Sequence, residues 1–161
     1  MATIKNLIIN YKRNTFVPTG TSDLLVESIK RKLKIKGDVL DLGAGSGYVG
    51  IKLLSLFKDK FNLFASDIGK SSTQIIKSNA KINKKKIIVK TGSLFKPWKN
   101  YKFNFIINDV SGISEDVAKI SPWFKNVSCK SGKDGTKLTV KIIKESKKFL
   151  DKKGIICFPI L

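Results

Sequence analysis

Apolar runs and stretches of helical periodicity alternate along most of the chain. Continuous runs of Ile, Val, Leu and Phe are typical of strands that are buried on both faces. Such runs occur at 39–42, 61–68, 87–89, 103–107 and 154–160, and a short β-like run covers 4–11. Between them, apolar residues recur every three or four positions, which predicts helices over 21–33, 47–57, 71–83 and 137–150. Strands that alternate with helices predict a parallel sheet with helices on both faces.

One stretch, D-V-L-D-L-G-A-G-S-G-Y-V-G-I at 38–51, carries most of the functional information. Its pattern predicts a short buried strand, a glycine turn and the start of a helix. Gly43, Gly45 and Gly47 allow backbone angles that are closed to other residues, and the missing Cβ atoms let a ligand approach the main chain. We expect Ser46 to cap the helix, whose free N–H groups would face that ligand. The stretch therefore predicts a cradle for a nucleotide cofactor.

Two classes of cofactor compete for this cradle. The spacing Gly45-x-Gly47-x-x-Gly50 also satisfies the dinucleotide fingerprint G-x-G-x-x-G. Asp41 distinguishes the two, because a carboxylate buried in a strand costs several kcal/mol unless backbone N–H groups or a cationic ligand satisfy it. S-adenosylmethionine carries an ammonium and a sulfonium, whereas the pyrophosphate of NAD would be repelled. Asp41 therefore favours S-adenosylmethionine.

Three segments resemble known methyltransferases. D-L-G-A-G-S-G at 41–47 is similar to motif I of class I S-adenosylmethionine-dependent methyltransferases. F-V-P-T-G-T-S-D-L-L-V-E at 16–27 resembles the segment that folds over the cofactor in the HemK/PrmC-like and "methyltransferase small domain" families, and G-K-D-G-T-K-L at 132–138 resembles their G-x-D-G-L segment. The alternative for 16–27 is an ordinary helix capped by Thr21 or Ser22. The resemblance implies methyl transfer from S-adenosylmethionine on a Rossmann-like, doubly wound α/β sheet with strand order 3-2-1-4-5.

The resemblance also implies which residues hold the cofactor. Asp67 ends the second strand, where a carboxylate accepts hydrogen bonds from ribose hydroxyls, although a helix-capping Asp is the alternative. T-G-S-L-F at 91–95 is similar to the loop that holds adenine in HemK-like enzymes. The expected cofactor-binding residues are Asp41, Gly43, Ala44, Gly45, Asp67, Ile68, Ser93, Leu94 and Asn108.

The end of the fourth strand, N-D-V-S-G at 108–112, is the expected catalytic segment. HemK-like enzymes carry Asn-Pro-Pro-Tyr here, and only Asn108 matches. Asp109 replaces a proline with a carboxylate, which can pair with a cationic acceptor or take a proton from an amine or hydroxyl. We expect Asn108 and Asp109 to be catalytic and a small polar acceptor or a protein amine to replace a stacked base. The alternative is that Asp109 only caps the turn at Ser111 and Gly112.

Two aromatic residues follow this segment. Trp123 and Phe124 can supply an aromatic wall to the acceptor site from a neighbouring loop. Large aromatic side chains usually pack inside, so we expect at least one of the two to lie in the core.

Composition limits the remaining possibilities. The 161 residues fit a single domain, 1–161, whose first 20 residues are expected to fold over the cofactor. With two cysteines, no histidine and no C-x-x-C, the sequence predicts a reducing cytosol and no metal site. No signal peptide or membrane-spanning run is apparent, so a cytoplasmic protein is expected.

The net charge of +20 favours a polyanion such as RNA as partner. However, only Arg13 and Arg31 are arginines, and lysine solubilises without specifying a base. A protein or small-molecule acceptor is therefore favoured, with RNA possible. An NAD(P)-dependent oxidoreductase and a non-catalytic RNA-binding module are the alternative functions. No residues remain for the hairpin that usually covers the fifth strand, so self-association through 154–160 is expected.

Overall fold

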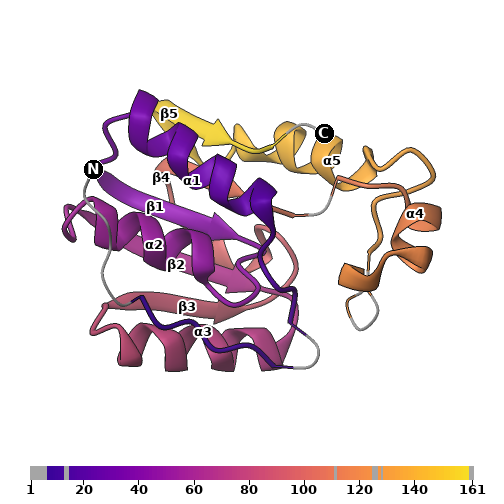
Figure 1. Ribbon diagram of the computed structural model, residues 1–161. Coiled ribbons are helices and arrows are strands. Elements are labelled where there is room, and N and C mark those ends of the chain that lie inside the picture. The colour runs from indigo at the N-terminus through magenta and orange to yellow at the C-terminus, as the bar shows by residue number, and fades with distance from the viewer. Residues whose placement is uncertain (1–6, 13–14, 111, 125–126, 128, 160–161) are drawn as a thin grey trace.

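The computed structural model describes residues 7–12, 15–110, 112–124, 127 and 129–159. Its centre is a five-stranded sheet in the order β3-β2-β1-β4-β5, in which every neighbouring pair is parallel (Figure 1). The strands are β1 Gly37–Leu42, β2 Phe61–Asp67, β3 Ile87–Thr91, β4 Phe103–Asn108 and β5 Leu150–Cys157. The predicted α/β class and strand order 3-2-1-4-5 are confirmed.

Helices cover the sheet on both faces. The elements are α1 Gly20–Lys32, α2 Tyr48–Leu56, α3 Lys70–Ile82, α4 Glu115–Ile120 and α5 Lys137–Ser146, with short 3-10 helices η1 Lys96–Trp98 and η2 Pro122–Phe124. Val39 packs in a core cluster with residues of α1 and α2, whereas its neighbour Leu40 packs with η1 and α5. Because successive strand residues point to opposite faces, these two clusters lie on the two sides of the sheet. The carboxyl ends of β1, β2 and β4 are left for the loops.

The last helix and strand differ from the predicted ranges. The helix predicted over 137–150 ends at Ser146, and β5 begins at Leu150 instead of Gly154. Phe149 continues the helical pattern in sequence, but its ring stacks on Phe95 with centroids 4.5 Å apart, and its carbonyl accepts the N–H of Phe103 at 2.8 Å. Contacts with the sheet therefore outweigh the local pattern. The predicted end at Ile160 lies outside the described residues.

Residues 7–12, here called the N-terminal strap, form no strand in the described part of the predicted run 4–11; residues 4–6 lie outside it. Their backbone pairs with the amide side chains of Asn79 in α3 and of Asn83, the C-cap of this helix. Asn79 accepts the N–H of Asn10 at 2.9 Å and donates to its carbonyl at 2.9 Å, and Asn83 does the same for Ile8 at 3.0 and 2.6 Å. Asn79 also donates to the carbonyl of Ser46 at 2.9 Å. The strap therefore lies along α3 and is tied to the glycine turn (Figure 1).

Two expected helix caps are wrong. Helix α1 begins at Gly20 after Thr19, and the structure gives Thr19 no side-chain capping bond. Ser22, one of the two expected caps, is turned toward the loop after β4 instead. Helix α2 begins after Gly47, which is in the left-handed conformation, and Ser46 does not cap it. Ser46 is instead buried, with an exposed fraction of 2%.

Helix α4 was not predicted from the sequence. Ser114 caps it by accepting the N–H of Val117 at 3.1 Å, and Glu115 and Asp116 place negative charge in its first turn. Together with η2 it projects beyond the carboxyl ends of the strands (Figure 1). No helix in the described part of the chain is long and apolar enough to cross a bilayer.

Candidate active site

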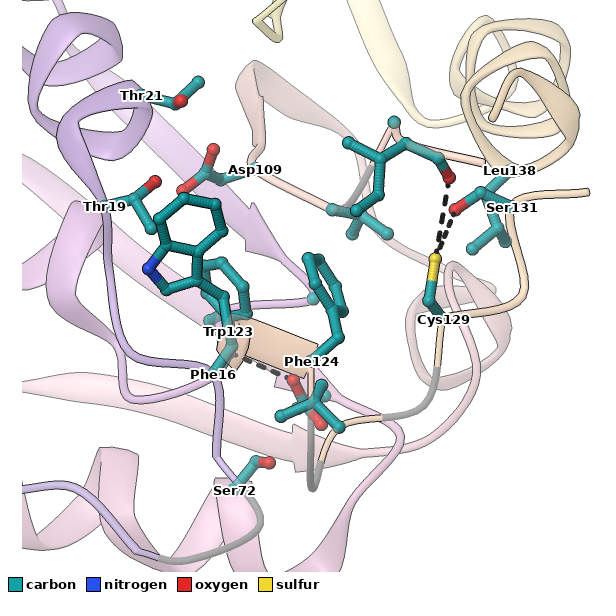
Figure 2. Close-up of a pocket in the computed structure, with 18 of the residues that line it drawn as sticks. Phe16, Thr19, Thr21, Ser72, Asp109, Trp123, Phe124, Cys129, Ser131 and Leu138 are labelled. Carbon is teal, nitrogen blue, oxygen red and sulfur yellow. Dashed lines mark hydrogen bonds between the residues drawn. The ribbon is translucent and has the colours of Figure 1, made fainter. Parts of the chain in front are cut away.

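A cavity of about 1120 Å³ opens at the carboxyl ends of β1, β2 and β4 (Figure 2). This volume exceeds the range of roughly 300 to 1,000 Å³ that holds one drug-sized ligand. Its floor is the turn after β1, and its far side is α4 and η2. The cavity lies where open α/β sheets bind their ligands, outside the carboxyl ends of the strands. Its size allows a cofactor and a second molecule to be held together.

The glycine turn has the backbone that the sequence predicted. Gly43, Gly45 and Gly47 have φ of 69°, 56° and 79°, in the left-handed region. A Cβ on Gly43 would collide with Val110, so glycine is also required there by packing. A Cβ on Gly45 would meet only the carbonyl of Phe16, at 4.0 Å. The main chain at Gly45 is therefore open to the cavity.

Asp41 lies at the end of β1 and is 1% exposed. Its Oδ2 accepts the N–H of Gly50, in the first turn of α2, at 2.9 Å. Burial raises the pKa of Asp41 to about 7; the bond from Gly50 opposes this rise, and the charges of Asp109 and Asp67 add to it. One backbone N–H therefore reaches one oxygen of this carboxylate, and the expectation that further N–H groups or a cationic ligand satisfy it stays a prediction. A cation in the cavity would favour its ionised form.

Asp67 connects two loops at the cavity wall. Its Oδ2 accepts the N–H of Gly45 at 3.0 Å and its Oδ1 accepts that of Gly69 at 2.8 Å. Helix α3 starts after Gly69 without a side-chain cap, so the alternative of a helix-capping Asp is not observed. The structure brings together on the cavity the expected cofactor-binding residues Asp41, Gly43, Ala44, Gly45, Asp67, Ile68, Ser93 and Leu94. Their contact with a cofactor stays a prediction.

Asp109 reaches the cavity but Asn108 does not. The Oγ of Ser22, on α1, donates to Oδ2 of Asp109 at 2.5 Å. Burial raises the pKa of Asp109, and this hydrogen bond opposes the rise. Asn108 is 2% exposed, and its Oδ1 lies 3.4 Å from the N–H of Val110. In this conformation Asn108 shapes the turn that carries Asp109, and its contact with a ligand stays a prediction.

Ser22 is a site residue that the sequence did not reveal. It lies 87 residues from Asp109 and was interpreted only as a helix cap. Helix α1 is held in place here by Asp23, whose Oδ1 lies 2.6 Å from the Nζ of Lys52 on α2. The described hydrogen bond of Asp109 thus crosses to α1. Ser111, part of the turn that Asp109 was alternatively expected to cap, lies outside the described residues.

An aromatic wall, formed by Phe16, Trp123 and Phe124, lines the far side of the cavity (Figure 2). The rings of Phe16 and Phe124 lie 5.2 Å apart, and Trp123 is 64% exposed. Neither Trp123 nor Phe124 belongs to the core clusters of the described residues, so the expectation that at least one packs in the core is wrong. The reason is that α4 and η2 stand beyond the sheet and have no core beneath them.

The turn at 132–136 supports this wall. Gly135 packs so closely on the backbone of Gly112 that a Cβ would collide with its carbonyl. Gly132 accepts the N–H of Glu115 at 3.0 Å and donates its own N–H to Oε1 of Glu115 at 3.0 Å. The glycines of the G-K-D-G-T segment therefore hold the start of α4 in position.

The charges of the cavity are opposite to those of the whole chain. Among the described residues that line it, the charged side chains are Asp41, Asp67, Asp109 and Lys130. The chain as a whole carries +20. Carboxyl groups outnumber lysine in the lining, so it suits cationic groups, which favour the ionised forms of Asp41 and Asp109, better than it suits a polyphosphate.

Known proteins share this sequence pattern and fold. The family described as methyltransferase small domain matches residues 17–109, more than half of the chain. The release factor glutamine methyltransferase of Aquifex aeolicus is 27% identical over 95% of this chain and 57% of its own length. A methyltransferase structure from Pyrococcus furiosus has a TM-score of 0.70 at 18% identity, covering 94% of this chain and 68% of that one.

A 16S rRNA methyltransferase of T. thermophilus, solved in complex with AdoMet and guanosine, has a TM-score of 0.63 at 16% identity. It is covered over 34% of its length, and this chain over 88%. Both solved structures share the fold of this chain. The chain spans 57% of the length of the curated relative from Aquifex aeolicus.

Proposed function

The chain belongs to the methyltransferase small domain family, and from this premise we propose that it transfers a methyl group from S-adenosylmethionine to a nitrogen or oxygen acceptor. One observation carries the proposal: the family match covers the glycine turn that opens into the cavity between the carboxylates of Asp41 and Asp67. Membership of this family argues against a nicotinamide-dependent oxidoreductase that uses Gly45, Gly47 and Gly50.

The residues of the cavity fit S-adenosylmethionine. The open main chain at Gly45 leaves space for a ligand, and the excess of carboxylates suits a cofactor with an ammonium and a sulfonium. When bound, this cofactor supplies a methyl group activated by the sulfonium. Asp41 would favour the ammonium, Gly43, Ala44 and Gly45 would hold the amino-acid part, Asp67 the ribose, and Ile68, Ser93 and Leu94 the adenine.

The remaining residues act on the acceptor. Methyl transfer needs a nucleophile aligned with the methyl group and water kept out, and the chain has no histidine to act as a base. Asp109 lines the cavity, is held by Ser22 and would face the acceptor, and Asn108 shapes the turn that carries it. We propose a protein or small molecule as the acceptor. The relative named above is a release factor glutamine methyltransferase, and a solved neighbour is an rRNA methyltransferase, so RNA stays a second candidate.

Calorimetry with three ligands tests the proposal. S-adenosylmethionine and S-adenosylhomocysteine should bind, and NAD should not. Binding of NAD alone would support the oxidoreductase, and binding of none would support an RNA-binding module with an inactive cradle. The Asp116→Asn variant, altered on the exposed face of α4, is a matched control that should bind as the unmodified chain does.

A further inference from the structure

The cavity has an apolar half that contains none of the nine expected cofactor-binding residues, although its Phe16 begins the segment 16–27 that resembles a cofactor-covering segment. This half is formed by the aromatic wall together with Val117, Ile120 and Leu138. Ile120 is 85% exposed and Trp123 is 64% exposed, and the two residues lie on one short segment. Exposing two large apolar side chains to water does not stabilise the fold. Contiguous exposed apolar groups at the rim of a cavity mark a ligand-binding surface.

The carboxylates of the cavity differ in how they are occupied. Both oxygens of Asp67 accept N–H groups of the turns, whereas Asp41, assigned above to the ammonium of the cofactor, accepts the N–H of Gly50 on Oδ2 alone. Asp109 receives the hydroxyl of Ser22 on Oδ2, and no described donor occupies Oδ1. An ionised carboxylate only accepts hydrogen bonds, so the group that meets this oxygen must be a donor.

Resting on the proposed function, we propose that the acceptor is a primary amine on an apolar carrier, with its ammonium on Asp109 and its carrier against the aromatic wall. A buried carboxylate is satisfied far better by a cation than by a neutral amide or hydroxyl, because a neutral donor leaves its charge uncompensated. The exposed indole of Trp123 attracts a cation by its π face as well as packing on the carrier. Figure 2 shows that Trp123 and Asp109 line the same cavity.

The aromatic wall narrows the choice of acceptor, for which the sequence alone favoured a small polar molecule or a protein amine. A small polar acceptor would leave Trp123, Phe124 and Ile120 in contact with water. Phosphate groups of a nucleic acid would meet three carboxylates at the cavity. An amine with a hydrocarbon or aromatic carrier satisfies both halves of the site, and a lysine side chain has the same chemistry, since its ammonium ends an apolar stem.

The charges balance in such a reaction. Asp109 takes one proton from the bound ammonium, which leaves a neutral amine with a free electron pair. That pair forms the new N–C bond as the S–C bond of the methyl donor breaks and leaves its electrons on sulfur. The product is a secondary ammonium, and the thioether leaves uncharged. Burial raises the pKa of Asp109, which brings it closer to that of the proton donor.

Tryptophan fluorescence provides a binding assay. The chain has two tryptophans, of which Trp98 is buried in the core and Trp123 lines the cavity. With S-adenosylhomocysteine present, 2-phenylethylamine should change the emission, and phenylethanol and phenylacetamide should bind at least about tenfold more weakly. Asp109→Asn should weaken amine binding about 10- to 100-fold and leave the affinity for S-adenosylhomocysteine within about twofold. Asp116→Asn is the matched control on α4 and should change neither affinity.

The outcomes separate this inference from the function on which it rests. If the unmodified chain does not bind S-adenosylhomocysteine, both the proposed methyl transfer and the amine acceptor are wrong. Cofactor binding with equal affinity for the amine, the alcohol and the amide would overturn the amine alone. This comparison uses the unmodified chain, so it holds even if Asp109→Asn fails to fold. A lysine-containing peptide tests whether the amine belongs to a protein or to a small molecule. The proposal is supported if either the peptide or the free amine binds more tightly than its own uncharged analogue.

Discussion

Asp41 couples the stability of the fold to pH. Burial raises its pKa to about 7, whereas the pKa of the group is about 3.9 in an unfolded chain. Between these values the folded protein keeps a proton that the unfolded chain releases, so the free energy of unfolding falls as pH rises through this window. The difference of about 3 units corresponds to at most about 4 kcal/mol. Asp41→Asn should flatten this decline, measured by urea unfolding between pH 4 and 8.

The exposed Asp116 supplies the control for this measurement. Asp116→Asn removes a carboxylate that lies on the surface of α4 and should leave the pH dependence as it is. An unchanged decline in Asp41→Asn would mean that other groups cause it. Asp109, whose pKa burial also raises, would then be the next carboxylate to replace.

Asp67 should matter for both binding and local stability. Asp67→Ala removes the proposed acceptor of the ribose hydroxyls, and affinity for S-adenosylhomocysteine should fall by about 1.5 to 3 kcal/mol. The change also leaves the N–H groups of Gly45 and Gly69 without their acceptor, so the free energy of unfolding should fall by about 1 to 3 kcal/mol. Calorimetry and thermal unfolding are measured on the same samples. Unchanged affinity in a folded variant would contradict the ribose role.

The strap is the element whose attachment can be tested most directly. Asn79 is fully buried and pairs with Asn10 and with Ser46, whereas Asn83 pairs with Ile8 nearer the surface. Asn79→Ala should therefore lower the free energy of unfolding by about 1 to 3 kcal/mol, more than Asn83→Ala does. It should also speed trypsin cleavage after Lys12.

The neighbouring Ser78 is exposed on the same helix and controls for helix propensity. Ser78→Ala should leave the cleavage rate unchanged. Equal cleavage of Asn79→Ala and Ser78→Ala would show that other contacts hold the strap. Because Asn79 also reaches the glycine turn, a released strap should weaken binding of S-adenosylhomocysteine in parallel.

At the scale of the whole molecule, β5 is an edge strand among the described residues. Its first half carries Asp151, Lys152 and Lys153, which discourage pairing, and its second half, Ile155–Cys157, is apolar. We predict self-association through this second half. The net charge of +20 repels a second copy, so the dimer fraction should rise with salt.

Sedimentation equilibrium at high micromolar concentration measures this association. Ile155→Lys should abolish it, and Ile120→Lys, altered on the distant α4, is the control that should not. A monomer at every salt concentration would contradict the prediction. Pro159, which cannot donate to a ladder, would then be the feature that blunts this edge.

Local sequence patterns are sufficient to predict the parallel sheet and the glycine turn of this protein. The strand, glycine turn and helix at 38–51 are contiguous, so spacing alone predicted the positive φ angles of Gly43, Gly45 and Gly47. The parallel sheet likewise follows from the alternation of strands and helices, because a short connection cannot join parallel strands. The position of Asp67 at the end of β2 could also be predicted, because Asp67 is contiguous with the apolar run that forms this strand.

Contacts between distant segments decided the rest. The bond from Ser22 to Asp109 spans 87 residues, and the strap pairs with α3 across 69 to 75. Phe149 lies outside α5 although it continues the helical pattern, because its ring stacks on Phe95. Trp123 is exposed instead of packing in the core, because α4 and η2 do not lie on the sheet. A sequence period describes neighbours along one element, whereas these contacts depend on how separate elements pack. The sequence by itself therefore determined the sheet and the glycine turn, and only the tertiary structure decided which distant segments, such as α1 and η2, line the cavity beside Asp109.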